Sequence, residues 1–169
     1  MGNEKPGIKI LIVDEESPNF MRGLARDLRE ASRRKKTCPG KEICPSKEDC
    51  PGIEDCPGIE IPVINVTRAE TREEALRIIA GTDDLFLVIT NLSVPEPDVA
   101  ENELNELIVS LARRQGIRVI GFCFGRDIEK IRQRFLDVLV LNKTAFEISD
   151  ITDVINAQRQ ALSATARAA

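Results

Sequence analysis

IKILIVDEES, residues 8–17, is the stretch of sequence that decides the fold of this chain. Its first six residues, Ile8–Val13, form an apolar run of the kind found in strands that are buried on both faces, as in a parallel sheet. The acidic residues Asp14 and Glu15 follow directly, and Pro18 then opens a helical pattern, because proline suits the first turn of a helix. The segment therefore predicts a strand that leads through an acidic connection into a helix.

The same alternation continues along the chain. Further apolar runs predict strands at Ile61–Val66, Leu85–Ile89, Arg118–Phe124 and Val138–Leu141. Helical spacing of apolar residues follows these runs, at Glu70–Ala80, 104–111, Asp127–Phe135 and Ile148–Leu162. Strands that alternate with helices specify a parallel sheet with helices on both faces. We therefore expect an α/β fold of the doubly wound, flavodoxin-like (βα)5 type, with strand order 2-1-3-4-5.

The chain is expected to form one domain. Its 169 residues suit a single domain, which we place at residues 1–163, and residues 164–169 are expected to be a flexible tail. Residues 37–60 form a Cys-rich insertion between the first helix and the second strand, because proline and glycine recur there too often for a helix or a central strand. Farther on, Thr71 and Glu74 resemble a capping box at the start of a helix.

Polar side chains follow four of the predicted strands. Asp14 and Glu15 follow the first strand, Asn91 the third, Cys123 the fourth and Lys143 the fifth. The carboxyl ends of parallel strands meet at one edge of a sheet, where doubly wound folds place their ligand sites. We therefore expect an acidic pair, an amide, a thiol and a lysine to converge there.

This constellation resembles the receiver domain of response regulators, the phosphoacceptor modules of two-component signal transduction. The texts ILIVDEES, LVITNLSVP and VLVLNKT resemble the family's first strand with its acidic pair, its acceptor strand and its lysine strand. The resemblance implies a site in which the acidic pair holds magnesium and an aspartate accepts phosphate from a histidine kinase. A hydroxyl side chain and the lysine would contact the phosphoryl group.

The sequence departs from that pattern at the positions that carry the chemistry. Asn91 stands at the acceptor position, and an amide oxygen is a poor nucleophile that cannot form the acyl phosphate. Cys123 stands at the hydroxyl position and is a weak hydrogen-bond donor. Thr144 and Val140 replace a proline and a switching aromatic residue of the family. We therefore predict a degenerate receiver that is not phosphorylated.

The remaining polar residues are interpreted as a remnant site. The loss of one carboxylate disfavours magnesium, so we expect Lys143 to neutralise Asp14 and Glu15. Cys123 is expected to be a small buried hydrophobic side chain, kept in the core by the phenylalanines on either side of it, and not a reactive thiol.

The insertion carries its own chemistry in a six-residue repeat, CPGKEI, CPSKED, CPGIED and CPGIEI. The four thiols, at Cys38, Cys44, Cys50 and Cys56, could hold zinc or an iron-sulfur cluster, and we predict that they act as a set without Cys123. Their even spacing departs from the usual knuckle, in which about two to four residues separate paired ligands. Heme bound through Cys-Pro dipeptides, reversible disulfides and a solvated loop without a ligand stay open as alternatives.

Composition narrows the class of function. The net charge of −4 and the absence of Trp and Tyr disfavour nucleic acid as a partner. No stretch has the length of an apolar membrane span or a signal core, so we expect a cytoplasmic protein. We expect no enzyme but a phosphorylation-independent signalling or adaptor module that binds a protein partner, with a homodimer left open. A zinc or iron-sulfur redox protein that uses the four cysteines is the alternative.

Overall fold

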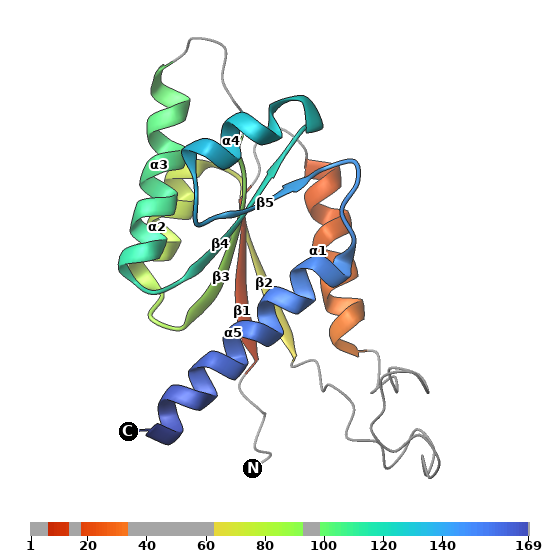
Figure 1. Cartoon of the computed structure of the whole chain (residues 1–169), viewed down its shortest axis with the longest axis vertical. Coiled ribbons are helices and arrows are strands. Elements are labelled where there is room, and N and C mark those ends of the chain that lie inside the picture. The colour runs from red at the N-terminus through yellow and green to blue at the C-terminus, as the bar shows by residue number, and fades with distance from the viewer. Residues whose placement is uncertain (1–6, 14–17, 34–62, 93–98, 169) are drawn as a thin grey trace.

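The computed structural model describes residues 7–13, 18–33, 63–92 and 99–168 (Figure 1). Strands and helices alternate along the chain, with one short 3-10 turn before the fourth α-helix. In chain order the elements are β1 Ile8–Val13, α1 Pro18–Arg33, β2 Ile64–Ala69, α2 Arg72–Gly81, β3 Leu85–Asn91, α3 Val99–Arg114, β4 Arg118–Cys123, η1 Gly125–Asp127, α4 Ile128–Arg134, β5 Leu139–Asn142 and α5 Ile148–Ala168.

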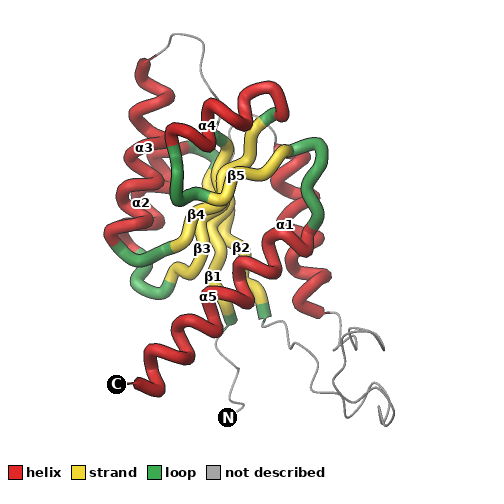
Figure 2. The backbone as a smooth tube through the Cα atoms, viewed as in Figure 1, coloured by secondary structure: helices red, strands yellow, loops and turns green. Residues whose placement is uncertain are grey.

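The strands form one parallel sheet in the order β2-β1-β3-β4-β5, which confirms the doubly wound, flavodoxin-like α/β fold (Figure 2). β1 is the second strand in this order and pairs with β2 from Ile8↔Ile64 to Val13↔Ala69. The chain reverses its direction of winding between β1 and β3, so β2 and β5 become the two edges. The carboxyl ends of β3, β4 and β5 meet at one end of the sheet, where the site residues were expected.

Two hydrophobic cores lie on opposite faces of the sheet. α1 and α5 cover one face, where Ile10 and Ile12 of β1 pack, and α2, α3 and α4 cover the other, where Leu11 and Val13 pack. Successive side chains of a strand point to opposite faces, so β1 needs apolar residues at successive positions because both of its faces are covered. This is the physical reason for the apolar run at Ile8–Val13.

The second strand differs from its predicted bounds. It was expected at Ile61–Val66, but β2 runs from Ile64 to Ala69, while residues 61 and 62 lie outside the described part of the chain. The apolar pattern weakens after Val66, yet backbone pairing with β1 continues through Ile12↔Arg68 and Val13↔Ala69. The ladder with a neighbouring strand therefore extends β2 beyond its apolar pattern, which the local sequence does not show.

Two predicted helices also differ at their ends. Asp127–Phe135 was expected as one helix, but a 3-10 turn at Gly125–Asp127 precedes α4. α5 continues to Ala168, so residues 164–168, which were expected to belong to a flexible tail, are helical. The small residues there are good helix formers, which explains how the helix extends past its apolar pattern. Among the described residues, no helix is both long and apolar enough to cross a membrane.

The predicted start signal of α2 is present, and a glycine follows the end of α3. Thr71 is the N-cap of α2, and its hydroxyl accepts a hydrogen bond of 3.1 Å from the backbone N–H of Glu74. The carboxylate of Glu74 reaches back to the backbone N–H of Glu70, one residue earlier than a standard capping box requires. After α3, Gly116 has a φ of 71°, a left-handed conformation that glycine adopts without a steric penalty.

Candidate functional site

The described part of the chain includes three of the five predicted remnant-site residues. Asn91, Cys123 and Lys143 lie in it, whereas Asp14 and Glu15 lie outside the described residues. The metal-binding set Cys38, Cys44, Cys50 and Cys56 also lies outside them. Within the part of the chain that the structure describes, no group of three or more His, Cys, Asp or Glu side chains is arranged to hold a metal ion.

Asn91 is the last residue of β3 and is buried, with 5% of its surface exposed. It is paired with Phe122 of β4 in the parallel ladder. Ile89 packs in the core between the sheet and the α1–α5 layer, and the alternation of side chains places Asn91 on that same face. The acceptor position of the receiver pattern is therefore a buried amide at the carboxyl end of a central strand.

Lys143 follows β5 directly. Its backbone N–H donates a hydrogen bond of 2.9 Å to the carbonyl oxygen of Cys123, which fixes the start of the segment after β5 against the end of β4. Only 9% of its surface is exposed. Its ammonium nitrogen lies 5.6 Å from the centre of the Phe20 ring and 5.3 Å from the centre of the Phe124 ring. These distances are in the range of cation–π contacts, in which an ammonium group is attracted to the face of an aromatic ring.

Phe20, one of the two rings beside Lys143, also belongs to an aromatic cluster built from three distant segments. Phe20 of α1, Phe122 of β4 and Phe146 after β5 contact one another edge to face, with ring centres 4.8 to 5.7 Å apart. Edge-to-face contacts are favourable because the positive ring edge meets the negative face of its neighbour. Sequence reasoning missed this aromatic cluster. The available signal was the alternation of side chains along β4, which puts Phe122 on the face opposite to the thiol of Cys123.

Cys123 lies on the other face of the sheet. Its side chain is 1% exposed and packs with Ile131, Phe135 and Val140 in the core under α2, α3 and α4. Burial raises the pKa of the Cys123 thiol above its usual value, and the charge of Asp127 raises the pKa further. The positive charges of Arg132 and Lys143 lower this pKa by less than burial raises it. The structure therefore places Lys143 near the thiol, whereas the thiol of Cys123 and the amide of Asn91 lie on opposite faces of the sheet.

One expectation about the surroundings of Cys123 is wrong. Phe122 is buried, but Phe124 is 50% exposed and contacts Lys143, so it does not hold the thiol in the core. β4 ends at Cys123, so Phe124 lies beyond the strand and no longer follows the alternation that buries Phe122. The side chains of α4 and β5 bury the thiol instead.

A hydrogen-bonded turn follows β5, with Thr144 at the position where the receiver pattern has a proline. The Asn142 side-chain oxygen accepts hydrogen bonds from the backbone N–H and the hydroxyl of Thr144, at 3.1 Å and 3.0 Å. This Asx turn satisfies the backbone and orients the segment that carries Lys143. Among the described residues no peptide bond is cis, and that includes the bond between Lys143 and Thr144.

Comparisons with known proteins find similarity to this chain in structure but not in sequence. No protein-family model and no curated protein matches the sequence. Among solved structures, the chain is similar to the crystal structure of an adenylate cyclase from Rhodopirellula baltica, with a TM-score of 0.56 and 19% identity over 96% of each chain. A de novo designed Rossmann 2x3 fold protein gives a TM-score of 0.49 and 10% identity over 87% of this chain and 85% of that one. At 19% identity, the first similarity shows a shared α/β fold and nothing about activity.

Proposed function

We propose that the chain is a phosphorylation-independent, receiver-like signalling or adaptor module that acts by binding a protein partner and has no catalytic residue. The observation that supports this most directly is Asn91, a buried amide at the end of β3 where the receiver pattern needs a nucleophilic carboxylate. An amide has no negative charge and is a poor nucleophile, so it cannot accept a phosphoryl group as aspartate does.

The surroundings of Lys143 and Val140 support a site that does not switch between an unphosphorylated and a phosphorylated conformation. The receiver pattern assigns this lysine to the phosphoryl group, but here its ammonium group lies beside the rings of Phe20 and Phe124. Val140 stands at the position of the family's switching aromatic residue and is buried in the core with Ile131. A small branched side chain in a packed core has no second position to occupy, so this strand offers no aromatic switch.

The surface formed by β5 and the helices α4 and α5 is the proposed binding surface. β5 is an edge strand, and the apolar residues Leu136 and Leu139 are exposed at its start, with 85% of Leu136 accessible to solvent. Exposed apolar side chains beside an open edge are features of protein-binding sites. A second copy of the chain is one candidate partner. Sedimentation would identify it by showing a dimer that forms as the protein concentration rises. The double variant Leu136→Ser, Leu139→Ser should then stay monomeric.

Phosphorylation is tested by treating the full chain with acetyl phosphate and magnesium and measuring its intact mass. We expect no addition to the wild-type protein. Asn91→Asp restores the carboxylate and is expected to give a small, acid-stable and base-labile mass gain of one phosphoryl group. A phosphorylated wild type, with the group mapped to Asn91 or a neighbouring carboxylate, would refute the proposal.

The input of this module is proposed to be metal or redox state, read by the four cysteines of the insertion. The support is the sequence repeat, because these residues lie outside the described part of the chain. The test is metal and acid-labile sulfide analysis of protein purified without oxygen, followed by Cys→Ser at each of the five cysteines in turn. Loss of metal in the variants at 38, 44, 50 and 56, and full occupancy in Cys123→Ser, are the expected results. Absence of metal from the wild type would leave the insertion as a solvated loop.

A further inference from the structure

β2 is an edge strand of the sheet, so one side of its backbone has no neighbouring strand among the described residues. The N–H of Ile8 in β1 donates a hydrogen bond of 2.8 Å to the carbonyl oxygen of Val63, so that carbonyl points toward the sheet. Backbone groups alternate along a strand, and the N–H and C=O of Ile64, Val66 and Arg68 therefore point outward. An exposed row of this kind is a template on which another extended chain can pair.

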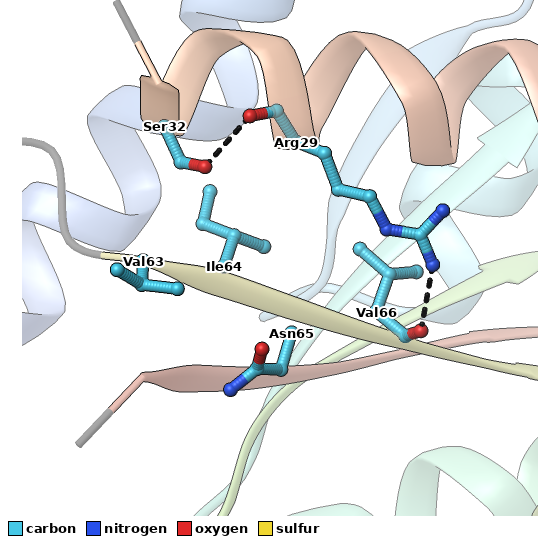
Figure 3. A pocket seen from close by; sticks show the side chains of 6 residues that line it. All are labelled: Arg29, Ser32, Val63, Ile64, Asn65 and Val66. Carbon is cyan, nitrogen blue, oxygen red and sulfur yellow. Dashed lines mark hydrogen bonds between the residues drawn. The ribbon is translucent and has the colours of Figure 1, made fainter. Parts of the chain in front are cut away.

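A groove runs along this edge between β2 and α1 (Figure 3). It has a volume of about 450 Å³ and is lined by Arg29, Ser32, Val63, Ile64, Asn65 and Val66. Arg29 extends from α1 across the groove, and its Nη2 donates a hydrogen bond of 3.1 Å to the carbonyl oxygen of Val66. The Ser32 hydroxyl bonds within its own helix, to the Arg29 carbonyl oxygen at 2.7 Å. Arg29 thus donates a hydrogen bond to one of the outward carbonyl oxygens with which an added strand would pair.

The helix beside the groove presents a row of arginines. Arg22, Arg26 and Arg29 follow one another at spacings of four and three residues, which puts them on one face of α1. Arg26 is paired with Asp27 at 3.1 Å and with Glu30 at 3.9 Å. Within the described ranges, no ion pair involves Arg22 or Arg29.

The strand contributes a further cation to the same face. Ile64 and Val66 pack toward α1 in the α1–α5 core, so alternation places Arg68 on that face as well. In the part of the chain that the structure describes, Arg68 has no carboxylate partner either. A strand that paired with β2 would therefore turn every second side chain toward arginines whose charge is not neutralised by a described neighbour.

We propose that the groove between α1 and β2 binds an extended acidic segment of a partner protein, which adds as a strand to the outer edge of β2. On binding, the hydrogen bond from Arg29 to the Val66 carbonyl oxygen breaks, and a backbone N–H of the partner donates to that oxygen instead. Arg29 then joins Arg22 and Arg68 in binding carboxylates at alternate positions of the added strand. Strand addition supplies affinity through the backbone and specificity through alternate side chains. This surface lies at the edge opposite to β5 and does not depend on the function proposed above.

The test uses the full chain and a fluorescein-labelled peptide of about eight residues in which valine and glutamate alternate, long enough to cover the six residues of β2. Two control peptides have the same length: one groups the glutamates at one end, and one replaces glutamate with lysine. Fluorescence anisotropy is expected to show saturable binding of the alternating acidic peptide alone. Amide hydrogen exchange is expected to slow at Ile64, Val66 and Arg68 when this peptide binds.

Matched charge reversals locate the site. Arg29→Glu and Arg22→Glu are each expected to weaken binding by about tenfold, and Arg29→Gln by less, because reversal adds repulsion to the lost attraction. Arg77→Glu, an exposed position on α2, is the control for net charge and should bind as the wild type does. Salt should weaken binding, since the charges are exposed to solvent.

Three results would overturn the proposal. Equal binding of the alternating and grouped peptides would show a charge attraction without strand pairing. Protection of the Ile64, Val66 and Arg68 amides in the free protein at every concentration, with no peptide bound, would assign the edge to another segment of this chain. Protection that grows with protein concentration in the absence of peptide would assign it to a second copy.

Discussion

Packing around a single thiol decides its chemistry. Because burial raises the pKa of Cys123, the reactive thiolate is scarce in the folded protein. We expect N-ethylmaleimide, at about pH 8, to label Cys123 slowly in the folded chain and rapidly after unfolding, as measured by peptide mass mapping. Labelling at the same rate in both states would show that the thiol is accessible without unfolding.

The same raised pKa makes a prediction about stability. The unfolded chain releases the Cys123 proton at a lower pH than the folded chain, so the free energy of unfolding falls as pH rises above about 8.5, the usual thiol pKa. Below that pH the thiol is protonated in both states and its stabilising effect is fully present. Urea unfolding of the wild type and of Cys123→Ala, compared from neutral to alkaline pH, should show a steeper decline in the wild type.

Gly121 tests how tightly the sheet packs at one position. A Cβ at Gly121 would lie 2.9 Å from Leu92 Cγ and closer still to Leu92 Cδ1, and Leu92 is fully buried. Gly121→Ala should therefore destabilise the protein by about 1–3 kcal/mol, through overpacking. Gly23→Ala on α1 is the matched control: nothing lies within 4 Å of its Cβ, and alanine favours the helix by about 0.5–1 kcal/mol. Equal effects of the two changes on the urea midpoint would contradict the packing argument.

At the scale of the element, α2 depends on Thr71, the N-cap residue just before it. The Thr71 hydroxyl accepts the Glu74 N–H, one of the backbone donors that a helix start leaves without a partner. We expect Thr71→Ala to lower the free energy of unfolding by about 1 kcal/mol and Thr71→Asp to restore it. The measurement is urea unfolding followed by circular dichroism. No loss in the alanine variant would mean that the cap contributes nothing measurable.

α2 and α3 are joined by a buried polar contact. Arg72 and Asn105 are both buried, and Arg72 Nε donates a hydrogen bond of 3.1 Å to Asn105 Oδ1. Asn105→Leu should cost about 1–3 kcal/mol, because it removes one acceptor of a buried charged donor. Arg72→Met should cost less in the Asn105→Leu background than in the wild type. A double-mutant cycle of unfolding free energies measures this coupling, and simple additivity would show that the contact is not energetically significant.

At the scale of the whole molecule, the insertion is expected to be separable from the fold. Residues 37–60 connect α1 to β2, an edge strand, and contain few large apolar residues. Replacing them with a short Gly-Ser link should change stability by on the order of 1 kcal/mol, because loop-closure entropy depends weakly on length. Thermal unfolding of the deletion variant should stay cooperative. Loss of the cooperative transition would make the insertion part of the folding unit.

The sequence by itself determined the element order, the parallel sheet and the positions of Asn91 and Lys143 at strand ends. These features are local: an apolar run buried on both faces, as at Ile8–Val13, and a polar residue directly after it can be read from neighbouring residues. The start of α2 at Thr71 is local for the same reason, since a cap involves residues within one turn.

The tertiary structure alone decided which side chains share a face. Lys143 lies among Phe20, Phe124 and their neighbours because α1, β4 and β5 converge there from distant parts of the chain, whereas Cys123 lies on the opposite face. The extension of β2 to Ala69 depends on backbone pairing with β1. Strand pairing and the burial of a side chain by distant segments both depend on residues far apart in the sequence. No local sequence pattern therefore predicts them, and they become visible only in the folded sheet.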